Sequence, residues 1–144
     1  MRAKVLFLVA MVVLAGSLQG ADATKDPLHG TWQAQSVEDD GNKPRPDDHF
    51  LIFKGDTFSV QVKGKVVAQG TYTSDPGKKP KSLDMTITDG KESIKGKTSL
   101  GIFAIEGDTL QWCAAKPGET ERPKDFTAPL GSHRLLATFK RAKD

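Results

Sequence analysis

The chain has three histidines, the residues best suited to acid–base or metal chemistry, at His29, His49 and His133. A structural metal site needs ligands at a close spacing such as H-x-x-x-H, and no such spacing occurs. His49 follows Asp47 and Asp48, so a cation could bind there, but we interpret these residues as a solvated loop surface. The sequence therefore predicts no metal site.

Nucleophilic and paired-carboxylate chemistry is not indicated either. Serines are plentiful, but none stands in a G-x-S-x-G nucleophile motif, and no glycine-rich phosphate loop opens a helix. The single cysteine, Cys113, is expected to be a small buried side chain, with an intermolecular disulfide or a reactive thiol as the alternatives. A catalytic pair of carboxylates is defined by the distance between them in the folded protein, and the sequence does not give that distance. The candidates are Asp39, Asp40, Asp84 and Glu106. We predict no catalytic residues and no cofactor, and an enzyme is the least favoured of three function classes.

The charge distribution argues against nucleic acid as a partner. The formal net charge is +3 at pH 7, and the basic residues within 77–81 and 91–97 are offset by acidic residues within 38–40 and 47–48. A nucleic-acid interface needs basic residues concentrated on one face. We interpret the charged residues as a solvated surface and predict no nucleic-acid partner.

The N-terminus has the order of a secretory signal peptide. A basic start precedes an apolar run over residues 5–15, and Ala21-x-Ala23 supplies a cleavage site. The run is shorter than the roughly 20 residues that a membrane span needs, and Ser17 stands where a lipoprotein signal would carry its cysteine. We expect residues 1–23 to be cleaved and residues 24–144 to be exported as one domain. The destination is the periplasm or the extracellular space, with no stable membrane anchor after cleavage.

The rest of the chain alternates apolar and polar residues, which is the pattern of half-buried strands. The alternation is clearest over residues 58–62 and 83–87, and glycine turns such as Gly55-Asp56 and Gly107-Asp108 separate the strand-like runs. No window of comparable length has a helical stripe. The predicted strands lie near residues 31–38, 49–54, 57–63, 66–73, 82–88, 98–105, 109–115 and 133–140.

Eight strands joined mostly by short connections predict an all-β fold, an eight-stranded antiparallel up-and-down barrel. Closure removes exposed strand edges, and a barrel of this size has room for side chains or one small ligand. Two connections are longer, over residues 39–48 and 116–132, and their prolines predict ordered loops. Phe126 and Leu130 favour a second loop that folds back on the barrel.

A set of short motifs occurs in order along nearly all of the predicted exported chain. The motifs are Leu28-x-Gly30-x-Trp32, Gly70-Thr71-Tyr72, Gly101-Ile102-Phe103, Gly107-Asp108-Thr109-Leu110, Cys113 with Pro117-Gly118, Arg122-Pro123 with Phe126, and Lys140-Arg141. Gly-x-Trp resembles the first motif of the lipocalin superfamily. The whole set resembles a family of small exported lipocalin-like domains, of unknown function, that is abundant in planctomycete bacteria.

The resemblance implies a lipocalin-like barrel with Trp32 across its closed end and an arginine of the last strand packed on the indole. Arg141 is the expected partner, and Lys140 is the competitor. An ordinary core position is the alternative role of Trp32.

The leading hypothesis is a binding module whose open mouth takes a small apolar or amphipathic ligand. For Trp112, one of the cavity candidates, filling the core is the default role and lining the cavity is the alternative. The alternative function is a protein-interaction or inhibitor module that uses the loops 39–48 and 116–132 on a solid barrel. The cavity candidates are Phe58, Val60, Val62, Tyr72, Met85, Ile87, Ile102, Trp112 and Phe139.

Overall fold

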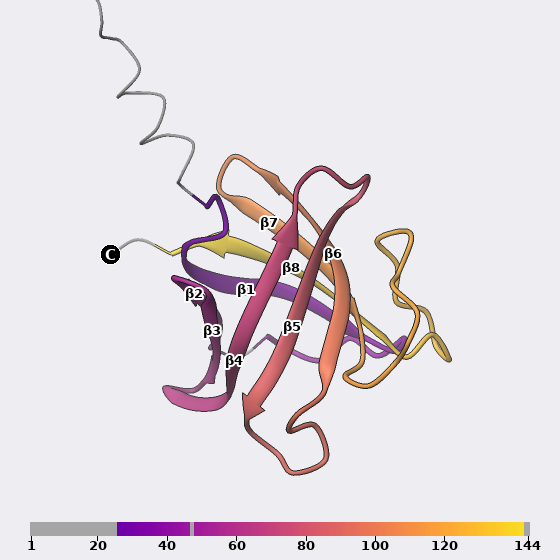
Figure 1. Ribbon diagram of the computed structural model, residues 1–144, viewed down its shortest axis with the longest axis horizontal. Coiled ribbons are helices and arrows are strands. Elements are labelled where there is room, and N and C mark those ends of the chain that lie inside the picture. The colour runs from indigo at the N-terminus through magenta and orange to yellow at the C-terminus, as the bar shows by residue number, and fades with distance from the viewer. Residues whose placement is uncertain (1–25, 47, 143–144) are drawn as a thin grey trace, which may run out of the picture.

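The computed structural model describes residues 26–46 and 48–142, so the predicted signal peptide lies outside the described residues. The described part of the chain is all-β and contains no helix. Within it, no helical segment exists that is long and apolar enough to cross a membrane. The strands (Figure 1) are β1 (Gly30–Asp39), β2 (His49–Lys54), β3 (Thr57–Val62), β4 (Lys65–Asp75), β5 (Lys81–Asp89), β6 (Thr98–Glu106), β7 (Thr109–Ala115) and β8 (Arg134–Arg141).

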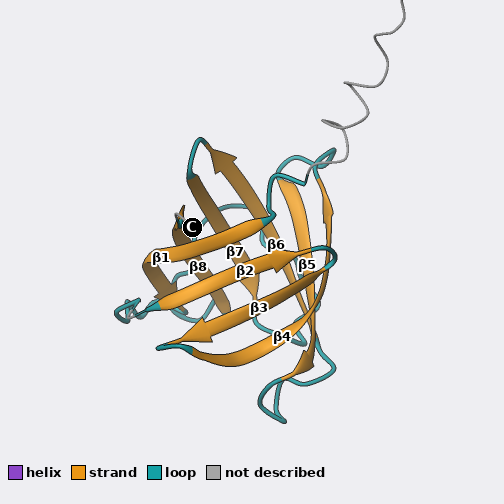
Figure 2. Ribbon diagram, turned by 90° about the vertical axis from the view of Figure 1, so that its left-hand side faces the viewer, coloured by secondary structure: helices purple, strands orange, loops and turns teal. Residues whose placement is uncertain are grey.

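The sheet closes into a barrel. Each strand pairs antiparallel with the next one along the chain, and β8 pairs with β1. Figure 2 shows the strands curving around a shared interior. The seam between β1 and β8 runs from Trp32 opposite Arg141 to Asp39 opposite Leu135. The predicted eight-stranded antiparallel barrel is confirmed, and closure leaves none of its strands as an edge.

Alternation along each strand divides the side chains between the interior and the outer face. In β5, Leu83, Met85 and Ile87 are buried in the core. Asp84 and Thr86, which lie between them, are only half-buried. The period-two pattern of the sequence is therefore the pattern of the barrel wall.

Gly70 is required at a point where the β5 backbone leaves no room for a side chain on β4. A β-carbon built on Gly70 would overlap the backbone carbonyl oxygen of Thr86. The β4–β5 ladder is irregular at the same place, between Gln69 and Gly70. A glycine beside such an irregularity lets a strand bend sharply, which a small barrel needs in order to close.

Trp32 and Arg141 close one end of the barrel. Trp32 is fully buried, and the Arg141 guanidinium lies 4.1 Å from the centroid of the indole. The indole N–H donates to the Leu28 carbonyl at 2.8 Å. Arg141 donates to the carbonyls of His29 at 2.7 Å and Pro27 at 3.0 Å. The contact expected from the sequence is present, and it ties the first and last strands to the segment that precedes β1.

The β7–β8 loop lies against the outer face of the barrel. Arg122 makes a bidentate ion pair with Asp84 of β5 and donates to the Gly101 carbonyl of β6 at 2.9 Å. Pro123 and Ala128 of the loop are buried. The expectation that this loop is ordered and folds back on the barrel is therefore correct.

The Leu130 side chain does not pack on the barrel, contrary to the expectation from the sequence. Its exposed fraction is 81 %. The backbone of Leu130 crosses close to Gly41 of the β1–β2 loop, whose N–H donates to the Ala128 carbonyl at 2.7 Å. Contact between the two loops is made by backbone at this point, and the leucine side chain is left in solvent.

Replacing Arg141 with alanine should lower the free energy of unfolding by about 1–3 kcal/mol, because the indole loses its cation and two carbonyls lose their donor. Arg141→Lys should recover part of this loss, since an ammonium keeps the charge but not the fork of donors. Urea unfolding followed by circular dichroism measures the effect. The exposed neighbour Lys140→Ala is the control, and equal stability of the Arg141→Ala and Lys140→Ala variants would contradict this role.

Candidate functional site

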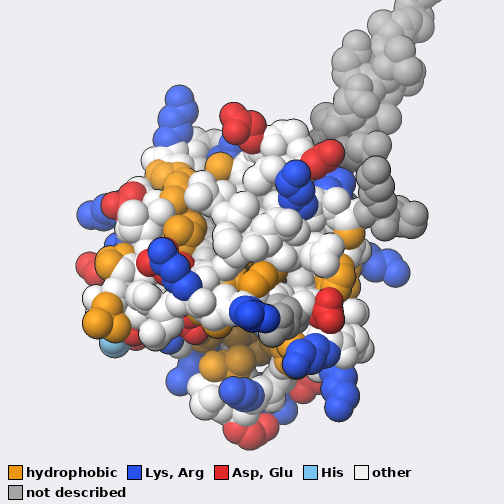
Figure 3. All heavy atoms as spheres, turned by 180° about the vertical axis from the view of Figure 1, so that it is seen from behind, with side chains coloured by type: hydrophobic (Ala, Val, Ile, Leu, Met, Phe, Trp, Pro, Cys, Tyr) orange, Lys and Arg blue, Asp and Glu red, His pale blue; other side chains and the backbone are white. Residues whose placement is uncertain are grey.

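An apolar cavity lies toward the end of the barrel opposite Trp32. It has two adjoining lobes, of about 220 and about 280 Å³. Figure 3 shows hydrophobic side chains within a hollow in the lower part of the view, with Lys and Arg side chains near it. Together the lobes reach the size range of small-molecule pockets, about 300–1,000 Å³. The residues that line both lobes are Asp39, Val60, Trp112 and Leu135.

The first lobe is walled by large side chains and kept open by small ones. The Ser99 hydroxyl donates to the Ala115 carbonyl at 2.7 Å, so it is not left unpaired in an apolar wall. The large side chains come from β3, β5 and β7 and are Phe58, Val60, Met85, Ile87 and Trp112. The small side chains on β4, β6 and β7 are Ala68, Ser99, Ala114 and Ala115.

The second lobe lies on the other side of Trp112, against β1, β2 and β8. Its walls include Ala34, Val37 and Phe139. The Phe139 ring centroid lies 6.4 Å from that of Trp112. The indole N–H of Trp112 is buried and makes no hydrogen bond within the described residues. Apart from Asp39, His49, Ser99 and Lys116, the side chains that line the two lobes are apolar.

The rim of the cavity carries charged groups that are only partly exposed. Lys116 Nζ lies 3.1 Å from Asp39 Oδ1, and both residues line the first lobe. Beside them, Asp40 accepts a hydrogen bond from the His133 backbone N–H at 3.0 Å. This hydrogen bond holds the pKa of Asp40 below its ordinary value. A charged rim around an apolar interior suits an amphipathic molecule whose polar end remains at the mouth.

Most of the interior candidates from the sequence line this cavity, but three lie elsewhere. Val62 is half-buried at the end of β3, opposite Lys65, beyond the lining of both lobes. Tyr72 lies at the closed end, and Ile102 lies on the outer face, as described below. The candidates that line the cavity are Phe58, Val60, Met85, Ile87, Trp112 and Phe139.

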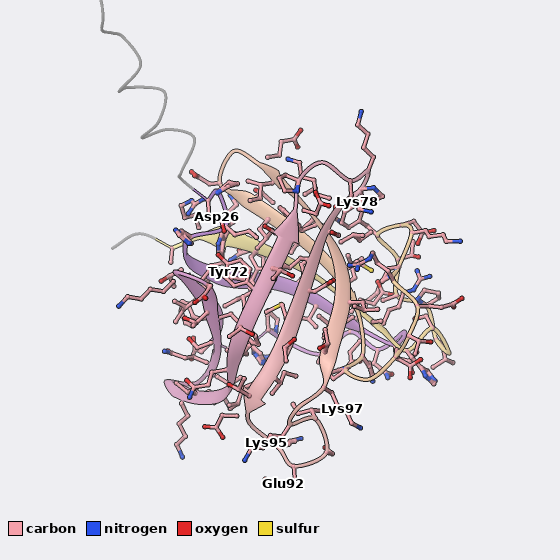
Figure 4. The ribbon with its side chains drawn as sticks, in the orientation of Figure 1. Asp26, Tyr72, Lys78, Glu92, Lys95 and Lys97 are labelled. Carbon is pink, nitrogen blue, oxygen red and sulfur yellow. The ribbon has the colours of Figure 1, made fainter. Side chains whose placement is uncertain are left out.

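Tyr72 packs at the closed end instead of lining the cavity. Its ring lies edge-on to Phe53 at 4.7 Å between centroids. Its hydroxyl donates to Asp26 Oδ2 at 2.6 Å and also approaches the Gly55 carbonyl at 3.1 Å. Figure 4 shows Asp26 and Tyr72 at the same end of the barrel. Burial and, second, the hydrogen bond to the Asp26 carboxylate raise the pKa of Tyr72 above its ordinary value of 10.0.

Ile102 faces outward and is covered by the β7–β8 loop. It lies opposite Ser82 and Cys113 in the ladders, whereas its neighbour Phe103 belongs to the core. Cys113 is fully buried on the same outer face, with its thiol 3.4 Å from the Thr127 carbonyl of the loop. Burial raises the pKa of this thiol. The loop therefore hides a second apolar layer outside the barrel wall.

Sequence reasoning missed the small residues that leave the cavity open. Ala68 lies opposite Val60, and Ala114 lies opposite both Gly101 and Leu135. Alternation along β7 does place Ala114 on the same face as Leu110 and Trp112, but it does not show that a small side chain there leaves space for a ligand. Large apolar side chains mark an inward position clearly, whereas small ones such as alanine give only a weak hydrophobic signal.

The described residues hold no group of three or more His, Cys, Asp and Glu side chains that could bind a metal ion. The fold and the site define a class: a closed eight-stranded antiparallel β-barrel with an apolar interior cavity. Comparison of the chain with models of protein families, with curated proteins and with solved structures finds no match. The lipocalin-like family stays a prediction from the sequence motifs.

Tyr72 should resist ionisation in the folded protein. Because its folded pKa is raised, the protonated phenol contributes stability that is fully present below pH 10.0 and is lost as the pH rises through the folded pKa. Tyr72 is the single tyrosine of the chain, so tyrosinate absorbance in an alkaline titration reports it alone. We expect little tyrosinate at pH 10.0 in the folded protein and about half ionisation in urea. Asp26→Asn should shift the titration to lower pH, and half ionisation of the folded wild type at pH 10.0 would contradict the buried hydrogen bond.

Cys113 should be nearly inert while the β7–β8 loop is in place. We expect Ellman's reagent to react with native protein at least about 100-fold more slowly than with urea-unfolded protein, because a buried thiol with a raised pKa supplies little thiolate. Arg122→Ala should increase the native rate, since it removes the ion pair that holds the loop on β5. Rapid reaction of the native wild type would show that the loop does not cover the thiol.

Proposed function

We propose that the protein binds a small apolar or amphipathic molecule inside its barrel and acts without covalent chemistry. The observation that supports this function is the two-lobed cavity of about 220 and 280 Å³ with an apolar wall. The wall residues lie on strands of a closed sheet and are already held in place, so ligand binding costs little conformational entropy of the protein. Such a site favours retention of a guest molecule.

The driving force is the removal of apolar ligand surface from water, about 25 cal/mol per Å². A polar end of the ligand would stay at the rim, near Asp39 and Lys116, where charged groups keep part of their hydration. A charge placed deep in the cavity would find no partner and would cost several kcal/mol. The preferred ligand is therefore neutral or carries its charge at one end.

The proposal includes export to the periplasm or the extracellular space as a lipocalin-like carrier. Its support is the basic start, the apolar run over residues 5–15 and the Ala21-x-Ala23 cleavage site. The fold needs no disulfide, since its single cysteine is buried and free. The described part of the chain can therefore keep its stability in an oxidising or a reducing compartment.

A second candidate is a protein-interaction or inhibitor module that uses the loops 39–48 and 116–132. The observation that favours it is the exposed Leu130 side chain, at the point where the two loops are joined by backbone hydrogen bonds. An exposed leucine on a fixed loop is a suitable anchor for a partner. We rank it second because it assumes a solid barrel, whereas the interior contains a cavity.

Ala68→Phe should fill the first lobe and weaken binding of the apolar fluorophore N-phenylnaphthylamine by at least about tenfold, because the new ring takes the volume of the guest. The matched control is Val67→Phe, which places the same side chain at the neighbouring, exposed position of the same strand, outside the lining of both lobes. Fluorescence titration gives both affinities, and circular dichroism verifies that each variant is folded.

A second measurement on the same titration does not depend on filling the cavity. Trp112 lines both lobes, whereas Trp32 is buried at the other end, so energy transfer to the bound fluorophore should fall in Trp112→Phe. Absence of binding to the wild type, or equal binding by Ala68→Phe and Val67→Phe, would overturn the proposed function.

A further inference from the structure

A second concave region lies on the outer face of the barrel, between the β4–β5 turn and the β7–β8 loop. It consists of two adjoining hollows of about 500 and about 300 Å³. Lys78, Lys79 and Pro80 line both hollows, so they form one groove. Figure 4 shows Lys78 at the opposite end of the barrel from Lys95 and Lys97. The groove shares no lining residue with the interior cavity.

The groove is strongly basic. Lys78, Lys79 and Lys81 come from the β4–β5 turn and the start of β5, and Lys124 comes from the β7–β8 loop. No aspartate or glutamate lines either hollow, and these four lysines make no ion pair with any described residue. The positive charge is therefore available to a partner, although the sequence alone suggested a solvated surface.

Arg122 has a different role, because its charge is already neutralised by Asp84. Its guanidinium is held on β5 and β6 by hydrogen bonds to Asp84 and to the Gly101 carbonyl. It fixes the position of the loop wall and therefore the width of the groove.

The floor of the groove is apolar. Ile102, Pro80 and Pro123 line the larger hollow, and Ile105 and Phe126 line the smaller one. Ile102 and Pro123 are buried, whereas Phe126 and Ile105 are half-buried. A partner that lies along both hollows would meet apolar contacts below and lysines at the sides.

We propose that this groove binds an extended acidic polypeptide segment in which apolar side chains alternate with aspartate or glutamate. Carboxylates of the segment would lie against the four lysines, and its apolar side chains would cover the exposed Pro80 and the half-buried Phe126. A single phosphate could pair with lysines but would leave the apolar floor uncovered. A sulfated polysaccharide would leave the apolar floor uncovered.

Fluorescence anisotropy with a short fluorescein-labelled peptide that alternates glutamate and leucine tests this inference on the whole folded protein. Charge reversal at Lys78, Lys79 and Lys124 (each Lys→Glu) should weaken binding by at least about tenfold. The matched control reverses three exposed lysines on other parts of the barrel and changes the net charge by the same amount; they are Lys54, Lys65 and Lys140. The control should retain most of the affinity of the wild type.

Two further probes test the role of the apolar floor. A peptide with glutamine in place of glutamate should bind weakly, and so should polyglutamate, because each supplies only half of the contacts. Equal weakening by both lysine triples, or binding of heparin or polyglutamate as tightly as the alternating peptide, would overturn the inference in favour of general polyanion attraction. These outcomes are independent of N-phenylnaphthylamine binding, since the groove and the cavity share no lining residue.

Discussion

The contact between the Trp32 indole and the Arg141 guanidinium joins the two strands that become neighbours only when the sheet closes. Without that seam, β1 and β8 would be two open edges able to pair with other chains. The seam also fixes register, and a slip of one residue would exchange the inward and outward side chains of a whole strand. The interior cavity, and not only the stability of the barrel, therefore depends on this one pairing.

The two ends of the barrel divide stability and binding between them. At the closed end, Trp32, Phe53 and Tyr72 fill the interior with rings, and the Tyr72 hydroxyl is satisfied by Asp26. Toward the mouth, small residues such as Ala68 and Ala114 leave apolar surface uncovered. A bound ligand can supply the packing contacts that are missing near the mouth and so stabilise the folded state, while the contacts at the closed end hold the barrel together without it.

Period-two alternation was sufficient to predict the strands and the barrel. The closing contact between Trp32 and Arg141 was predicted from the resemblance of Gly-x-Trp to the lipocalin motif. Alternation did not distinguish inward from outward residues where a loop covers the outer face of the barrel. Residues 101–103 of β6 are all buried, because Phe103 packs in the core and the β7–β8 loop covers Ile102, so parity could not show that Ile102 points outward. The position of Tyr72 depends on the stagger of strands around the barrel, which local alternation does not encode.

The described chain enters the barrel beside Trp32 and leaves it just after Arg141, so both ends emerge at the base, away from the mouth (Figure 1). A linker attached at either end would thus hold the molecule by its base. On a sensor chip or a bead, every copy would be oriented alike, with its cavity facing the solution. The same geometry would let two barrels be joined in tandem without either one obstructing the opening of the other.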